Sequence, residues 1–167
     1  MKVLALDQAS VTTGYAIFED DKLIDYGKFT IEDDDIAVRL VKIRNKVKDL
    51  IDNNNIEKVV FEEIQLQNNV VNNVQTFKVL SEVYGVILEL VQEKELPYMT
   101  VLAGTWKSFL GIKGAKRQEQ KRNAQQFILN TLLIKATQDV CDAICIGLYA
   151  ISKKTVVVNE NVGFDWS

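Results

Sequence analysis

Short apolar runs separated by polar turns predict five β-strands in this chain. The first run, within "MKVLALDQAS", ends at Asp7 and is typical of a buried strand. Two β-type runs flank the acidic turn at residues 19–21, which indicates a hairpin. "IEKVVFEEI" predicts a further strand, and "YMTVLA" after Pro97, the only proline, predicts a short fifth one.

Helical spacing of apolar residues accounts for most of the remaining chain. Helices are predicted over residues 36–53, 74–95 and 105–110. A further helix follows the basic segment and ends at about residue 133, and the last helix begins at residue 138. Three asparagines end the first helix, and the amide-rich "QLQNNVVNN" is expected to form a mobile surface loop. No repeat or linker divides the sequence. We therefore expect one α/β domain over residues 1–167, with a mixed five-stranded sheet flanked by helices.

The segment 74–95 is the longest predicted helix and carries two apolar stripes. One stripe includes Phe77 and Val91, and a second beside it includes Val79 and Val86. Together they cover more of the helix than one core-facing side requires. Either the helix is sandwiched within the domain, or its second stripe contacts another subunit. We favour the second alternative, a homodimer through this helix.

Composition excludes several classes of protein. Of the 167 residues, 47% are apolar and 26% charged, as in an ordinary globular domain. No apolar run is long enough to span a bilayer, and the start lacks a signal-peptide layout. Cys141 and Cys145 are expected to be core residues in a reducing cytoplasm. The absence of histidine excludes a Ser-His-Asp or Cys-His apparatus and any imidazole-ligated metal.

The net charge of −3 hides a basic segment in an otherwise acidic chain. Residues 107–122 carry a net charge of +5, which leaves −8 for the rest. The basic residues of this segment are Lys107, Lys113, Lys116, Arg117, Lys121 and Arg122. Such a concentration of cations favours binding to phosphate groups.

Carboxylates occur where predicted strands end and where the final helix begins. Asp7 ends the first strand, and Glu62 and Glu63 end the strand "VVFEE". Asp139 and Asp142 lie one turn apart on the same side of the final helix. Each carboxylate alone is compatible with a solvated strand end or with the helix macrodipole. Asp142, placed in the first turn among apolar neighbours, needs a cation beside it. Oxygen ligands without histidine favour Mg²⁺ or Mn²⁺, ions that support phosphodiester cleavage in pairs.

Three stretches, "ALDQASVTTGYAIF", "VVFEEI" and "TQDVCDAICIGLYAI", resemble the three acidic motifs of the RuvC family of Holliday-junction resolvases, in the same order. The resemblance spans nearly the whole chain. It implies an RNase H-like fold, a homodimer, and Mg²⁺-dependent incision of four-way and other branched DNA. It also implies two ions per site, with Mn²⁺ as a substitute, and paired nicks that leave 5′-phosphate and 3′-hydroxyl ends.

The resemblance assigns roles to individual positions. Metal binding and catalysis fall to four carboxylates, Asp7, Glu62, Asp139 and Asp142. A one-residue slip that would make Glu63 the ligand stays open. Lys107 corresponds to a functional family lysine and is counted with the catalytic residues, and either Lys116 or Arg117 corresponds to a second. The cations of residues 107–122 are the expected DNA contacts.

The sequence departs from the family pattern at two places. Gln8 and Ala9 replace Pro-Gly after the first aspartate, which predicts a differently shaped turn. Bacterial relatives carry an aromatic residue three positions after the catalytic glutamate, where this chain has Gln65, or Leu66 if Glu63 is the ligand. These departures argue against base wedging and strict cleavage-sequence preference. They suit a phage or mobile-element member acting in a host cytoplasm.

Other interpretations predict different activities. A different RNase H-like nuclease would act on structured RNA or on fork and flap DNA. An ATPase or sugar-kinase-like domain would need phosphate-binding loops, and the chain has no G-x-x-x-x-G-K-[ST] motif. A binding protein would recognise branched DNA without cutting it. A panel of labelled substrates separates these alternatives.

Overall fold

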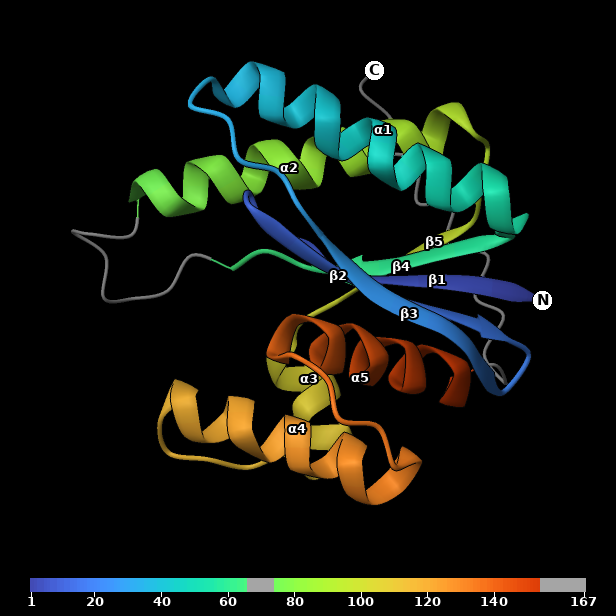
Figure 1. The fold of residues 1–167 in the computed structure, drawn as a ribbon, viewed down its shortest axis with the longest axis vertical. Helices are drawn as coiled ribbons and strands as arrows, with labels where there is room; N and C mark the ends of the chain where they lie inside the picture. Colours follow the sequence, from blue (N-terminus) through green and yellow to red (C-terminus); the bar gives the residue numbers. More distant parts are fainter. Residues whose placement is uncertain (66–73, 154–167) are drawn as a thin grey trace, which may run out of the picture.

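The computed structural model describes residues 1–65 and 74–153, which form a five-stranded sheet with helices on both faces (Figure 1). The strands are β1 (Lys2–Asp7), β2 (Thr12–Glu19), β3 (Lys22–Thr30), β4 (Lys58–Glu62) and β5 (Tyr98–Val101). The helices are α1 (Ile36–Asn54), α2 (Val74–Glu93), α3 (Ala103–Phe109), α4 (Arg117–Leu132) and α5 (Gln138–Ser152). The strand order is β3-β2-β1-β4-β5. The predicted α/β architecture is confirmed.

The sheet is mixed because one half is a hairpin and the other half is parallel. The β1–β2 and β2–β3 pairs are antiparallel, whereas the β1–β4 and β4–β5 pairs are parallel. The expected hairpin turn is present between β2 and β3, where Asp20 has a φ of 56°. Since parallel neighbours end at the same edge of a sheet, the acidic ends of β1 and β4 come together.

Both faces of the central strands are buried, which explains their nearly continuous apolar sequences. Successive side chains point to opposite faces. On β1, Leu4 and Leu6 belong to the core beneath α1 and α2. Val3 and Ala5 belong to the opposite core, which also contains α5 residues.

The helices α1 and α2 cover one face of the sheet and contact each other (Figure 1). The buried residues of α2 are Val83, Ile87, Leu90 and Val91. They come from both predicted stripes, so the core-facing side uses part of each. Val79 and Val86 stay partly exposed.

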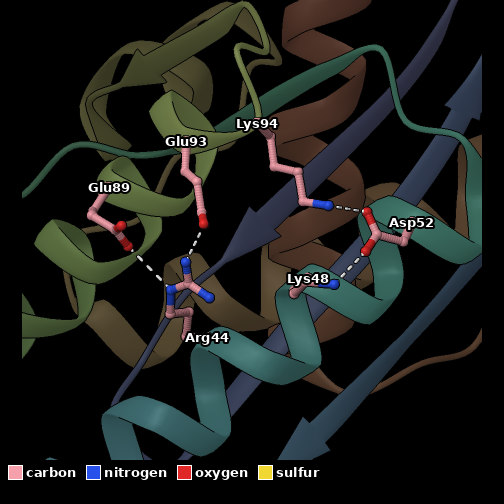
Figure 2. Close-up of polar contacts among 6 residues, drawn as sticks. All are labelled: Arg44, Lys48, Asp52, Glu89, Glu93 and Lys94. Atoms are coloured by element: carbon pink, nitrogen blue, oxygen red, sulfur yellow. Dashed lines mark hydrogen bonds and ion pairs between the residues drawn. The ribbon is translucent and has the colours of Figure 1, made fainter.

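Ion pairs join α1 to α2 and its C-terminal flank at the outer surface (Figure 2). Arg44 on α1 bonds to Glu89 and Glu93 on α2. Asp52 accepts hydrogen bonds from Lys48, one turn earlier, and from Lys94 just past the end of α2. Because these groups are exposed, each pair adds at most about 1 kcal/mol to the stability of the packing.

The helix α5 lies between the sheet and α4, so it is buried on nearly all sides, as its sequence predicted (Figure 1). Gly147 allows the close approach of its backbone to β2. A Cβ at that position would lie 2.1 Å from the ring of Phe18. Cys141 and Cys145 are free and buried, as expected of core residues.

A few boundaries differ from the predictions. The helix expected over 105–110 covers Ala103–Phe109 instead. The amide-rich loop was predicted over residues 65–73, of which 66–73 lie outside the described part of the chain. Within the described residues, every helix is too short or too polar to cross a membrane.

Candidate active site

Three neighbouring strands place Gly14, Asp7 and Glu62 in one row at the edge of the sheet. Asp7 pairs with Gly14 across β1 and β2. The β1–β4 register pairs Leu6 with Phe61, which brings Glu62 beside Asp7. Residues two positions away on each strand belong to the core beneath α5, so by alternation this row faces α5 as well.

Two further carboxylates come from α5. Asp139 lies in its first turn. Asp142 begins the second turn, because the helix starts at Gln138; its predicted place in the first turn was wrong by one residue. A Cβ at Gly14 would lie 2.0 Å from the carbonyl oxygen of Asp139. The missing side chain at Gly14 therefore lets the start of α5 approach the sheet edge beside Asp7.

The four carboxylates are partly buried and act on one another electrostatically. Burial raises the pKa of Asp7 well above its ordinary value, and the charges of Asp142, Glu62 and Asp139 raise it further. Burial likewise raises the pKa of Asp142 to about 6 and raises that of Glu62. These groups form one acidic site, in which the other three carboxylates oppose ionisation of Asp7.

The donor chemistry of this acidic site fits a hard divalent cation. All four side chains offer carboxylate oxygens, the ligands that Mg²⁺ and Mn²⁺ prefer. A cation would also relieve the repulsion that raises the pKa of Asp7. Within residues 1–65 and 74–153, no three acidic or cysteine side chains already converge as a finished metal site. The site thus has the chemistry of a metal centre without preformed coordination.

Glu62 and Glu63 have different surroundings. The charge of Glu62 raises the pKa values of both Asp7 and Asp142. The carboxylate of Glu63 instead accepts a hydrogen bond from the Tyr84 hydroxyl at 3.2 Å and one from the following backbone N–H at 3.0 Å. The geometry therefore favours Glu62 over Glu63 as the member of the acidic site.

Lys107 on α3 lies next to the acidic site. Its charge lowers the pKa values of Asp142 and Glu62. Its ammonium donates a hydrogen bond to Gln120 on α4 at 3.3 Å and lies 5.2 Å from the centre of the Trp106 ring. Lys107 is therefore held between two helices, with its charge directed at the carboxylates.

Two cations of α4 also act on the acidic site. Lys121 lowers the pKa values of Asp7 and Asp142, and Arg117 lowers that of Glu62. A cavity of about 370 Å³ is lined by Glu62, Lys107, Arg117 and residues of α2. The other predicted DNA contacts are exposed along the same segment: Lys113, Lys116 and Arg122. The basic segment therefore borders the carboxylates and extends away from them over the surface.

Sequence comparison identifies the family. The model described as "Crossover junction endodeoxyribonuclease RuvC" matches residues 3–150, most of the chain. The chain belongs to the RuvC family. A search of curated proteins finds no sequence match.

Solved structures share the RuvC fold with this chain. RuvC of T. thermophilus, in complex with Holliday junction substrate, superposes with a TM-score of 0.74 at 15% identity and covers 93% of this chain and 96% of its own. Fowlpox virus resolvase, in complex with Holliday junction DNA, gives 0.61 at 16% identity, with 91% and 97% covered. The yeast mitochondrial resolvase Ydc2 gives 0.56 at 13% identity, with 89% and 77% covered. These matches confirm the predicted RNase H-like fold.

Two residues that motif analysis did not place in the site contact Glu62. Trp106 Nε1 donates a hydrogen bond to Glu62 Oε2 at 3.0 Å. Gln8, a departure from the RuvC motif, bonds to the backbone of Glu62 through its side-chain amide. The turn that follows Gln8 is held by the Thr13 hydroxyl, which bonds to both backbone groups of Ala9. The sequence gives one indication of this position for Trp106, which is its place next to Lys107, a predicted site residue.

Proposed function

We propose that this protein is a structure-selective endonuclease that resolves four-way DNA junctions. The observation that carries the proposal is the acidic site itself, in which Asp7 and Glu62 from parallel strands face Asp139 and Asp142 from α5. Membership of the RuvC family supports the assignment of this site to phosphodiester hydrolysis. The bordering cations support a nucleic-acid substrate.

The four carboxylates would hold two Mg²⁺ ions, for which Mn²⁺ substitutes. Ions held there would supply a lowered pKa for an attacking water and neutralising charge for the departing 3′ oxygen, which would give 5′-phosphate and 3′-hydroxyl ends. Lys107, beside Asp142 and Glu62, is assigned to the phosphate at the cut. The remaining cations bind flanking phosphates with salt-dependent affinity: Lys113, Lys116, Arg117, Lys121 and Arg122.

A homodimer through α2 would place two acidic sites on opposing strands of a junction and produce paired nicks. Apolar side chains left at the surface of α2 support this assembly. Val74 is 58% exposed, and Val79 and Val86 are partly exposed. Sedimentation equilibrium of the wild type and of a Val79→Glu, Val86→Glu variant tests this assembly, which predicts a dimer and a monomer respectively.

A synthetic four-way junction labelled on each strand tests the proposed activity. Incubation with Mg²⁺ should give symmetric cuts on two opposing strands, and incubation with EDTA should give none. Asp7→Asn should abolish cutting while binding to the junction is retained. Wild-type turnover by that variant in Mg²⁺ would remove the basis of the proposal.

The same assay separates the alternative functions. Preferred cutting of fork, flap or structured RNA substrates would point to another RNase H-like nuclease. Tight junction binding without cutting in either Mg²⁺ or Mn²⁺ would point to a binding protein. The cytoplasmic location stays a prediction from cysteine usage.

A further inference from the structure

Glu62 is held from two directions by residues that are not carboxylates. The first is Gln8, whose side chain is nearly buried, with the residue 9% exposed. Its Nε2 donates to the backbone carbonyl of Glu62 at 2.6 Å, and its Oε1 accepts from the Glu62 backbone N–H at 3.1 Å. This pair of bonds continues the pairing of β1 and β4 past the last ladder residues. It fixes the backbone from which the Glu62 carboxylate projects.

The second direction is set by Trp106 on α3. This residue is 1% exposed and belongs to the core beneath the sheet. Its indole Nε1 donates to Glu62 Oε2 at 3.0 Å. Within residues 1–65 and 74–153, this is the only side-chain hydrogen bond to the Glu62 carboxylate.

These contacts restrain the Glu62 side chain against repulsion within the acidic site. Glu62 shares that site with other carboxylates, and repulsion favours rotation of its side chain away from them. An indole N–H is a donor only and cannot compete as a metal ligand. A buried donor therefore restrains the carboxylate without occupying the position of an ion. Contacts of this kind around ligating carboxylates commonly decide metal affinity.

We propose that Gln8 and Trp106 are positioning residues that preorganise Glu62 for a divalent cation, Gln8 through the backbone and Trp106 through the carboxylate. The proposal rests on the proposed function, because it takes Glu62 as a ligand. It also accounts for Gln8, since an amide at that position makes two bonds that the family's proline could not make.

The chain contains a matched control for Trp106. Tyr84 donates to Glu63 Oε2 at 3.2 Å, as Trp106 donates to Glu62 Oε2 at 3.0 Å. Trp106→Phe and Tyr84→Phe each remove one donor and keep an aromatic ring. Only the first bond lies on the proposed metal ligand.

Calorimetric titration of the DNA-free protein with Mn²⁺ is the primary test. Wild type and Tyr84→Phe should bind Mn²⁺ alike, whereas Trp106→Phe should bind at least about tenfold more weakly. Junction cutting supplies a second readout. The Mg²⁺ concentration for half-maximal rate should rise in Trp106→Phe, and saturating Mg²⁺ should restore the wild-type maximum. A packing defect would instead lower the cutting rate at every Mg²⁺ concentration, saturating Mg²⁺ included.

Gln8→Met keeps the test decisive if Trp106→Phe does not fold. This variant retains a side chain of similar length, removes both bonds to the Glu62 backbone, and should weaken Mn²⁺ binding in the same direction. Wild-type Mn²⁺ affinity in each variant that folds would overturn the positioning role while leaving the nuclease proposal intact. Failure of the wild type itself to bind Mn²⁺ and to cut junctions would overturn both proposals.

Discussion

Asp142 carries its charge at a cost to the metal-free fold, and the substitution Asp142→Asn removes that cost. The carboxylate is partly buried on α5, and the charges of Glu62 and Asp139 oppose its own. Lys107 and Lys121 counter the repulsion from these two carboxylates, so burial is the largest contribution to this cost. We therefore expect Asp142→Asn to stabilise the ion-free protein at neutral pH, although it removes a proposed ligand.

The pKa of Asp142 gives the magnitude and the pH range. Its rise from 3.8 to about 6 corresponds to about 3 kcal/mol once the group is ionised in both the folded and unfolded states. Because the folded protein holds this proton more tightly than the unfolded chain does, the free energy of unfolding falls as pH rises through this range. The advantage of the variant should be absent below about pH 4 and complete above about pH 6. Residual solvent contact lowers the expected gain to between about 1 and about 3 kcal/mol.

Urea unfolding in EDTA, followed by circular dichroism at about pH 4 and about pH 8, measures the effect. Glu63→Gln is the control, since its carboxylate lies outside the acidic site and should show no comparable gain. Added Mg²⁺ should stabilise the wild type more than Asp142→Asn, which narrows or reverses the difference at pH 8. Equal stabilities of wild type and variant at about pH 8 in EDTA would refute the reasoning, as would an undiminished advantage at about pH 4.

Three further predictions concern other parts of the molecule. Gly14→Ala should abolish junction cutting and lower the thermal midpoint, because the new Cβ would clash with the Asp139 carbonyl. Gly85→Ala is the control: a Cβ there has no neighbour within 4 Å, so this variant should keep activity and gain about 0.5 kcal/mol of unfolding free energy in urea. Lys121→Gln should weaken junction binding and reduce the slope of log affinity against log salt by about 1 in a filter-binding titration. Arg44→Ala removes two exposed ion pairs, so it should cost at most about 2 kcal/mol in urea unfolding and leave cutting unchanged.

The meeting of Asp7 and Glu62 could be predicted because it depends on local pattern and on one rule of sheet topology. Each residue ends an apolar run that predicts a strand, and neighbouring parallel strands end at the same edge of a sheet. The apolar pattern of α5 likewise placed Asp139 and Asp142 on one side of a buried helix. These patterns account for the two pairs of carboxylates separately, whereas the meeting of the two pairs depends on how α5 packs against the sheet.

The contacts of Trp106 and Gly14 could not be predicted in this way. Trp106 reaches Glu62 from a short helix 44 residues later in the chain, and only the packing of α3 against the sheet brings the two together. Gly14 has an ordinary strand conformation, and its importance lies in the approach of α5, which alternation along β2 does not reveal. The sequence shows which residue types are present, whereas these contacts depend on how closely separate elements approach.

The basic segment and the acidic site compensate each other, so a chain of net charge −3 can still carry a basic surface suited to the proposed phosphate binding. Lys107 and Lys121 lower the pKa of Asp142, so each cation offsets part of a charge that opposes folding. The same groups lie where the proposed function requires a phosphodiester. The distribution of charge over residues 107–122, rather than the net charge of the chain, is therefore the quantity that bears on the binding partner.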